Sequence, residues 1–242
     1  MTTNPFDLFG SPETPVRIVF ISDIHAVYEP PGNMEKVVER INALEPDIVL
    51  LGGDLIEGSP NELPLLEPLS GIMAPHGTFA VLGNHDYGSW GCPADASVAD
   101  ETERALEGIG ITVLRNENEI LEVQGEKFAL IGLDEYWVCR NDYATASAGV
   151  PDYMPKVVLA HNELAVGPDE IAGPSVILSG HTHCGQVNVP IITRLFFGPD
   201  FDGAVGGRAQ IDDDTGLYVT CGITPGGIRF LAPPEISVIE LQ

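Results

Sequence analysis

The chain has 242 residues, of which 44% are apolar, and its 36 acidic residues against 11 basic ones give a formal net charge of −25. This length and apolar content are enough for one sizeable hydrophobic core. So few basic residues argue against binding to nucleic acid or to an anionic membrane surface, because both need clustered positive charge. The acidic excess is typical of proteins that work in molar salt, and it also fits an ordinary acidic bacterial protein.

The first fifteen residues contain neither a positively charged segment nor an apolar stretch, so the sequence predicts no secretory signal and a cytoplasmic location. We expect residues 1–15 to form a poorly ordered extension and residues 16–242 to form a single domain. No apolar run approaches the roughly 20 residues of a membrane-spanning helix, so we expect no stable membrane insertion. The cysteines are far apart and form no C-x-x-C pair, which predicts isolated reduced thiols. They are Cys92, Cys139, Cys184 and Cys221.

Five apolar runs along the chain are each followed at once by Gly, Asp, Asn or His. Continuous aliphatic runs of this kind predict strands that are buried on both faces. Helical spacing of apolar residues predicts helices over 33–44, 61–69 and 95–109, so strands and helices alternate in the first half. The apolar runs and their polar ends span residues 17–25, 47–54, 78–86, 156–162 and 175–183.

Beyond residue 110 the predicted strands lie closer together in the chain. We therefore predict an α/β (α+β) fold in which two mixed β-sheets pack on each other and are covered by helices. Residues 134–155 are predicted to form a loop with a short helix, and the aromatic residues of this loop either floor a substrate pocket or close the edge of the core. The additional strands are predicted at 112–114, 119–123, 128–132, 217–220 and 236–241.

Polar and ionisable side chains follow several of these predicted strands directly. Ligands of open α/β sheets bind at the carboxyl ends of strands, so we expect these side chains to converge on one crevice. Imidazole, carboxylate and amide groups without thiolate suit Mn, Fe, Zn or Mg, and their number exceeds what one ion can use. We predict two divalent metal ions, with Mn as the first choice and a bridging carboxylate from Asp54. The side chains are those of Asp23, His25, Asp54, Asn84, His85, His161, His181 and His183.

The order of these motifs resembles that of the calcineurin-like metallophosphoesterase superfamily. The motifs are D-x-H at 23–25, G-D at 53–54, G-N-H-D at 83–86, a single His161, and G-H-T-H at 180–183. The resemblance implies a four-layer α-β-β-α sandwich. The segment GHTHCGQ and the C-terminal tail further resemble the subgroup of YkuE-like and YaeI-like phosphodiesterases and UDP-2,3-diacylglucosamine pyrophosphatases.

The resemblance also implies a role for each motif residue. Asp54 would bridge the two metal ions, and a metal-bridging hydroxide would attack phosphorus in line. His85 would be the general acid beside the scissile phosphate, with Asp86 orienting its ring. One ion would be held with Asp23, His25 and His183, and the other with Asn84, His161 and His181. Taken one at a time, each Asp could instead be a helix cap and each His a packing residue.

We therefore predict a binuclear metal-dependent phosphoesterase that cleaves a phosphodiester or pyrophosphate bond in a small phosphate-ester or nucleotide-type substrate. Arg194, Arg208 and Arg229 are candidates for binding substrate phosphate, because guanidinium groups match phosphate oxygens. The alternatives are a non-catalytic binding scaffold of the same fold, or a phosphomonoesterase or nuclease of the same superfamily. The scarcity of basic residues disfavours the nuclease.

Overall fold

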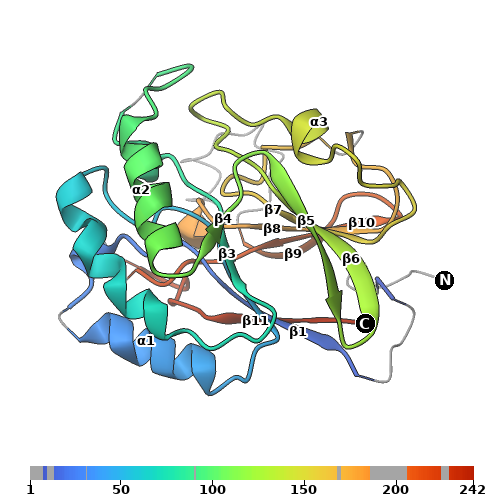
Figure 1. Cartoon of the computed structure of the whole chain (residues 1–242), viewed down its shortest axis with the longest axis horizontal. Helices are drawn as coiled ribbons and strands as arrows, with labels where there is room; N and C mark the ends of the chain where they lie inside the picture. Colours follow the sequence, from blue (N-terminus) through green and yellow to red (C-terminus); the bar gives the residue numbers. More distant parts are fainter. Residues whose placement is uncertain are drawn as a thin grey trace.

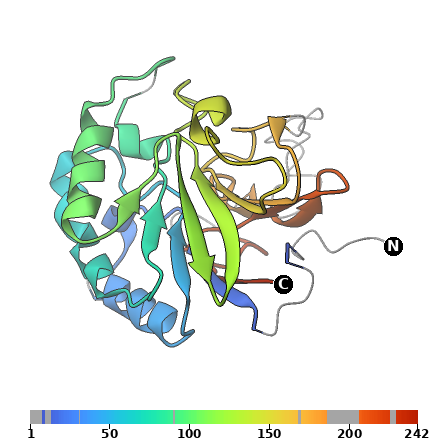
Figure 2. The same ribbon diagram turned by 45° about the vertical axis from the view of Figure 1, so that its right-hand side comes forward.

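The computed structural model describes residues 8–9, 14–30, 32–89, 91–167, 170–185, 206–224 and 229–242. Its centre consists of two mixed β-sheets, as the sequence predicts (Figures 1 and 2). The first sheet has the strand order β11-β1-β2-β3-β4, in which β1 to β4 are parallel and β11 is antiparallel to β1. Its strands are β1 (Val16–Ile21), β2 (Ile48–Leu51), β3 (Thr78–Ala80), β4 (Thr112–Val113) and β11 (Ser237–Leu241).

The second sheet has the order β5-β6-β7-β8-β10-β9, with parallel pairing from β6 to β10 and an antiparallel strand at each edge. The edge strand β9 (Gly207–Gln210) is absent from the sequence prediction, because it contains no apolar run and its residues are only half-buried or exposed. The other strands are β5 (Glu117–Val123), β6 (Glu126–Gly132), β7 (Lys156–Leu159), β8 (Ser175–Ser179) and β10 (Thr215–Val219).

The central strands are buried on both faces, which is why their sequences read as continuous apolar runs. In β1, Ile18 and Phe20 pack between the two sheets, whereas Val19 and Ile21 face the helices that cover the first sheet. The layer between the sheets also contains Phe128 of β6. Successive side chains of one strand thus belong to two different apolar layers.

Helices α1 (Asn33–Asn42) and α2 (Ser97–Gly108) cover the outer face of the first sheet (Figures 1 and 2). The segment predicted as a helix over 61–69 is instead a run of 3₁₀ turns, η2 (Pro60–Gly71). Pro64 and Pro68 lie inside it, and proline removes a backbone donor and clashes with the preceding turn of an α-helix. On the outer face of the second sheet lie the single-turn helix α3 (Tyr143–Ala146) and loop residues.

The prediction of isolated reduced cysteines is wrong. Cys92 is bonded to Cys139, and Cys184 is bonded to Cys221. Cys184 and Cys221 meet because they follow the neighbouring parallel strands β8 and β10, so a separation of 37 residues in sequence closes to 4.7 Å between Cα atoms. Tertiary proximity of this kind leaves no spacing signal in the sequence.

Most of residues 1–15, which we expect to form a poorly ordered extension, lie outside the described residues. Phe9 is described, and its backbone N–H donates to the carbonyl of Gln242 at 2.7 Å while its ring lies 5.8 Å from that of Phe128. Within the part of the chain that the structure describes, no helix combines the length and apolar character needed to cross a membrane.

Candidate metal centre

The predicted ligands converge because they follow parallel strands whose carboxyl ends meet at one edge of the two sheets. Asp23 and His25 follow β1, Asp54 follows β2, and Asn84 follows β3. His161, His181 and His183 follow β7 and β8 of the second sheet. All seven side chains are thus delivered to the interface between the ends of the sheets, as the strand-end argument predicts.

One group of possible ligands is formed by Asp23, His25 and His183, whose ligand atoms all lie within 4.8 Å of one another. The Nε2 atom of His183 is 3.5 Å from Asp23 Oδ1, and Asp23 is fully buried. Asp23 also accepts the backbone N–H of His181 at 3.1 Å, which ties the turn after β8 to the end of β1.

A second group with the same 4.8 Å limit is formed by Asp54, His161 and His181. His161 Nε2 lies 3.2 Å from Asp54 Oδ2 and 3.2 Å from His181 Nδ1. The Nδ1 atom of His161 contacts the Gly52 carbonyl at 2.8 Å, so a proton on Nδ1 leaves Nε2 directed at Asp54. Asp54 Oδ2 is also 3.7 Å from His25 Nε2, so this carboxylate lies between the two groups.

The amide oxygen of Asn84 is a direct sign that a cation fits here. Asn84 is 2% exposed, and its Oδ1 atom has no hydrogen-bond partner. A buried polar atom without a partner costs free energy, and a metal ion is one group that satisfies an oxygen lone pair. Nitrogen and oxygen donors around a shared carboxylate are a set that suits divalent Mn, Fe, Zn or Mg.

The backbone is strained at the predicted ligands. Asp23, His25, Asp54, His181 and His183 all have positive φ angles, between 42° and 66°. Left-handed conformations are uncommon for residues other than glycine and cost about 1–3 kcal/mol each. Such strain persists only where the surrounding structure enforces it, and it clusters at functional sites.

Two glycines allow the ligand-bearing turns to approach one another. A Cβ atom on Gly83 would lie 2.2 Å from Asp54 Oδ1, and one on Gly180 would lie 2.4 Å from Asp23 Oδ2. Both separations are shorter than any real carbon–oxygen contact. The glycines of the G-N-H-D and G-H-T-H motifs therefore make room for the acidic ligands of neighbouring strands.

The electrostatics of the second group are those of a coupled ion pair. Burial alone would raise the pKa of Asp54, but the charge of His161 outweighs burial and holds this pKa well below its usual value. Burial opposes protonation of His161, and Asp54 in turn raises the pKa of His161 well above its usual value. Burial and the positive charge of His161 lower the pKa of His181 to about 3. The two neighbouring imidazoles are thus shifted in opposite directions, the pKa of His161 upward and the pKa of His181 downward.

The side chain of His85 is partly exposed, and the carboxylate of Glu57 lies against its ring. The Nδ1 atom of His85 lies 3.0 Å from Glu57 Oε2, and His25 Nδ1 lies 2.6 Å from Glu57 Oε1, although without good hydrogen-bond geometry. Asp86, which the family resemblance would place against this ring, instead accepts backbone N–H groups of Leu55, Ile56 and Gly83 at 2.8–3.0 Å. Burial and the charge of Asp54 raise the pKa of Asp86 to about 7.

Sequence reasoning also missed two buried carboxyl groups beside the centre. Glu135 is 1% exposed and Glu163 is 6% exposed, and each has one carboxylate oxygen without a hydrogen-bond partner. Burial raises both pKa values, that of Glu163 to about 7. Neither residue lies in a motif, so in a chain with 36 acidic residues nothing in the sequence distinguishes them.

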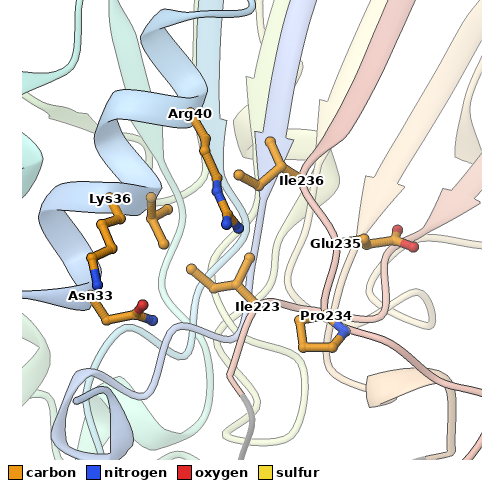
Figure 3. A pocket seen from close by; sticks show the side chains of 8 residues that line it. Asn33, Lys36, Arg40, Ile223, Pro234, Glu235 and Ile236 are labelled. Atoms are coloured by element: carbon orange, nitrogen blue, oxygen red, sulfur yellow. The ribbon is translucent and has the colours of Figure 1, made fainter.

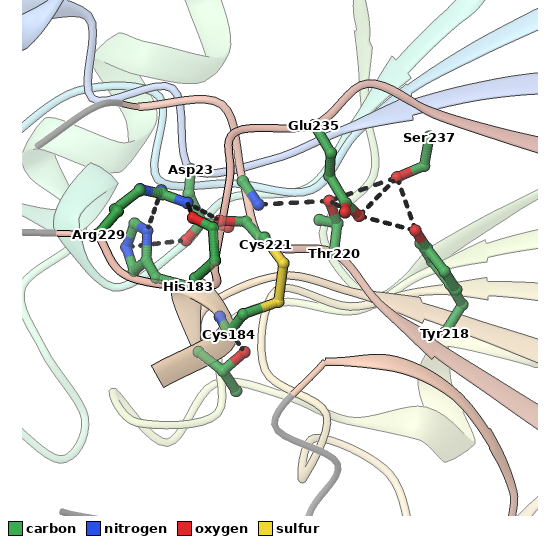
Figure 4. The surroundings of a disulfide bond; sticks show 12 residues. Asp23, His183, Cys184, Tyr218, Thr220, Cys221, Arg229, Glu235 and Ser237 are labelled. Atoms are coloured by element: carbon green, nitrogen blue, oxygen red, sulfur yellow. Dashed lines mark hydrogen bonds and ion pairs between the residues drawn. A yellow bond between two sulfur atoms is a disulfide. The ribbon is translucent and has the colours of Figure 1, made fainter. Parts of the chain in front are cut away.

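Of the three candidate arginines, Arg229 is the one that the structure places at the predicted ligands. Its Nη2 atom lies 3.2 Å from His183 Nδ1, and its Nη1 atom donates to the Cys221 carbonyl at 2.8 Å (Figure 4). Burial lowers its pKa. Arg208 is exposed on the edge strand β9, and Arg194 lies outside the described residues.

The described part of the chain includes the following two cavities. One has a volume of about 390 Å³ and lies between α1 and the segment that precedes β11, with Lys36, Arg40 and Ile223 in its lining (Figure 3). Glu235 also borders it, but its carboxylate points away and accepts hydrogen bonds from Tyr218 and other hydroxyl groups (Figures 3 and 4). The other cavity, of about 660 Å³, is lined by Tyr136, Trp137, Cys139 and Asn141.

A buried carboxylate between two groups of histidines, at the ends of two packed mixed sheets, defines the class of the metal-dependent phosphoesterases. The family described as calcineurin-like phosphoesterase matches residues 16–185, and the chain belongs to this family. The family resemblance seen in the sequence motifs is thereby confirmed.

Several characterised and uncharacterised relatives match nearly the whole chain. The metallophosphoesterase YkuE of Bacillus subtilis, described as uncharacterised, is 30% identical over 93% of this chain and 79% of its own length. The phosphodiesterase YaeI of Escherichia coli is 28% identical over 96% of this chain and 84% of its own. The UDP-2,3-diacylglucosamine pyrophosphatase LpxG of Chlamydia trachomatis is 26% identical over 93% and 83%.

Solved structures with low sequence identity share the fold. A phosphopantetheinyl hydrolase from Mycobacterium tuberculosis aligns with a TM-score of 0.53 at 13% identity, over 84% of this chain and 87% of its own. A dimetal phosphatase from Danio rerio aligns with a TM-score of 0.53 at 11% identity, over 94% of this chain and all of its own. These neighbours have the metallophosphoesterase fold, which confirms the predicted fold class.

Proposed function

We propose that this chain is a binuclear metal-dependent phosphoesterase that hydrolyses a phosphodiester or pyrophosphate bond. The observation that carries this proposal is the placement of Asp54 between two groups of histidines, with the unpartnered amide oxygen of Asn84 beside them. A second carboxylate, Asp23, lies in the first group. A non-catalytic scaffold would have no reason to retain these strained and buried groups together.

Each predicted ligand has a place in this proposal. Two divalent cations, with Mn as the first choice, would lower the pKa of a water molecule and offset the charge of the phosphate. Asp54 would be shared between them. Asp23, His25 and His183 would hold one cation, and Asn84, His161 and His181 would hold the other.

His85 is suited to act on the substrate rather than to bind metal. Its side chain is 31% exposed, whereas His161 is fully buried, so His85 can meet a substrate oxygen. Its backbone N–H donates to Asp54 Oδ1 at 2.9 Å, which fixes the ring beside the proposed centre. With Glu57 at Nδ1, the Nε2 atom can give a proton to the departing oxygen.

We propose the type of bond that is cleaved from the reactions of two relatives. YaeI is a phosphodiesterase and LpxG is a pyrophosphatase, and both match more than nine-tenths of this chain. Both reactions attack a phosphorus atom that carries an organic or phosphoryl leaving group. A small phosphate ester or nucleotide-type molecule is therefore the proposed substrate, and a nucleic acid is not, because the net charge is −25.

The disulfides bear on where the protein works. The sequence alone predicts the cytoplasm, but disulfides persist mainly in oxidising compartments. The Cys92–Cys139 and Cys184–Cys221 bonds therefore favour an oxidising environment for this chain.

A direct test is hydrolysis of bis(p-nitrophenyl) phosphate by chelator-treated protein supplied with Mn, Fe, Zn, Co or Mg. We expect turnover with at least one of these ions, and no turnover with any of them would refute the enzymatic function. The His85→Ala variant should keep its metal content and lose hydrolysis. Equal hydrolysis by this variant would remove the proposed role of His85.

A further inference from the structure

An open cleft lined by aromatic side chains lies beside the predicted metal ligand His181. The ring centroid of Trp137 is 4.2 Å from that of His181, and the two rings are nearly perpendicular, at 81°. Trp137 is nevertheless 51% exposed and Tyr136 is 39% exposed. A large aromatic surface therefore remains open to solvent in direct contact with the proposed centre, although most residues of this type are largely buried.

The segment that carries both aromatic residues is held in place by several contacts. The backbone N–H of Trp137 donates to the buried Glu135 Oε1 at 2.9 Å. Cys139 is bonded to Cys92, and the Arg140 guanidinium donates twice to the Ala94 carbonyl, at 2.6 and 3.2 Å. A ligand that binds this surface would not need to order it first, which lowers the cost of binding.

The lining of the cleft determines the chemistry of the group that it can accept. Among the described residues, the lining consists of Tyr136, Trp137, Asn141 and the disulfide-bonded Cys139, and none of these side chains is charged. A second phosphate or a carboxylate would find no cation among these described residues, so an uncharged group matches them best. Asn141 Nδ2 already donates to the Ala165 carbonyl at 2.7 Å, which leaves the amide oxygen to accept a hydrogen bond. A flat ring with polar N–H groups at its edge satisfies both features.

On the basis of the phosphoesterase function proposed above, we infer that Trp137 and Tyr136 bind the uncharged aromatic ring of one organic substituent of the substrate, such as the base of a nucleoside phosphate. A substituent that extends from a phosphate at the metal centre past His181 meets Trp137 directly. Stacking on an aromatic side chain tolerates different bases, so the site selects a class of substrate rather than one base.

The test compares three phosphate monoesters that differ in their organic group: adenosine 5′-monophosphate, ribose 5-phosphate and octyl phosphate. Binding to Zn²⁺-loaded protein is followed by tryptophan fluorescence in a Trp90→Phe background, in which Trp137 is the only tryptophan. Inhibition of bis(p-nitrophenyl) phosphate hydrolysis gives a second affinity. We expect adenosine 5′-monophosphate to quench the fluorescence and to bind about tenfold to hundredfold more tightly than ribose 5-phosphate, as stacking of one base predicts.

Three variants isolate the role of the ring, and inhibition supplies their affinities. The Trp137→Leu variant keeps an apolar side chain but has no ring at this position. It should therefore bind adenosine 5′-monophosphate and ribose 5-phosphate with about equal affinity. Trp137→Phe should keep most of the preference. Tyr153→Leu removes an aromatic residue that is 80% exposed and outside the lining, and it should keep the full preference.

The outcomes separate the two proposals. Equal binding of adenosine 5′-monophosphate and ribose 5-phosphate by protein that hydrolyses bis(p-nitrophenyl) phosphate would overturn the inference and leave the phosphoesterase function standing. Octyl phosphate binding as tightly as the nucleotide would overturn it in favour of an alkyl substituent. Absence of both hydrolysis and phosphate binding would overturn the proposed function and the inference with it.

Discussion

Replacing Glu57 with glutamine tests how the rings of His25 and His85 are oriented. One carboxylate lies against the Nδ1 atoms of two rings, His85 at 3.0 Å and His25 at 2.6 Å. The Glu57 carboxylate can accept from the Nδ1–H of His85 and lies close to Nδ1 of His25 without hydrogen-bond geometry, so both Nε2 atoms face away from it. Glutamine has the same shape but offers one acceptor and one donor, so at least one ring must turn or change its tautomer.

The expected magnitude follows from the loss of a charged partner. A hydrogen bond to a charged group contributes about 1.5–3 kcal/mol, which corresponds to roughly 10-fold to 150-fold in rate or affinity. Carboxylates that orient metal-binding histidines have effects of about 10-fold to 100-fold. We therefore expect Glu57→Gln to lower kcat/KM for bis(p-nitrophenyl) phosphate by about 10-fold to 100-fold, and to weaken metal binding through His25.

The assay separates the two rings by a double-mutant cycle. In a His85→Ala background, which has lost hydrolysis, Glu57→Gln should still weaken metal binding measured by calorimetry, because His25 remains beside the replaced carboxylate. Glu62→Gln is the matched control, since Glu62 accepts the backbone N–H of Glu57 and touches neither ring in the described contacts. Turnover and metal affinity of Glu57→Gln within twofold of the unmodified protein would refute the reasoning.

Three further predictions concern pH, the disulfides and the stability of the second sheet. Asp54 holds the pKa of His161 above its usual value, so a proton competes with the metal for this ring. Metal affinity should therefore rise with pH by up to tenfold per pH unit until that pKa is passed. Calorimetric affinities that do not change with pH would contradict this. Replacing either the Cys184–Cys221 or the Cys92–Cys139 pair with serines should lower the free energy of unfolding by about 2–4 kcal/mol, but only the former, which adjoins a predicted ligand, should weaken metal binding. The Lys156→Met variant leaves three backbone carbonyls without their buried donor. It should lower the free energy of unfolding, measured in urea melts, by about 3 kcal/mol and leave the metal content unchanged. An unaltered urea midpoint would count against this role of Lys156.

The sequence predicts the positions of the proposed ligands well because two independent signals coincide. Aliphatic runs such as Val16–Ile21 mark strands that are buried on both faces, and the first polar residue after each run marks where the strand ends. Parallel pairing of β1 with β2 then brings Asp23 and Asp54 to one edge of the first sheet, and pairing of β7 with β8 brings His161 and His181 to one edge of the second. The two mixed sheets and the convergence of the motif residues could be predicted in this way.

Features that depend on tertiary contacts could not be predicted. Glu57 lies three residues after Asp54 in a loop, and nothing in its local sequence separates it from the other acidic residues of the chain. The disulfides join residues that approach only when the strands are in place. The aromatic residues of the loop over 134–155 divide between the two arrangements that the sequence leaves open, because Trp137 lies against His181 and is 51% exposed whereas Tyr143 is buried in the core.

The central claim is that Asp54 is shared between two bound cations that together support hydrolysis. It is tested most directly by titrating metal-free protein with Mn²⁺ while recording both bound metal and the rate of bis(p-nitrophenyl) phosphate hydrolysis. We expect a rate that reaches its maximum at two equivalents, and an Asp54→Asn variant that has lost both the second equivalent and the activity. A maximum at one equivalent, or an Asp54→Asn variant with full activity, would contradict it.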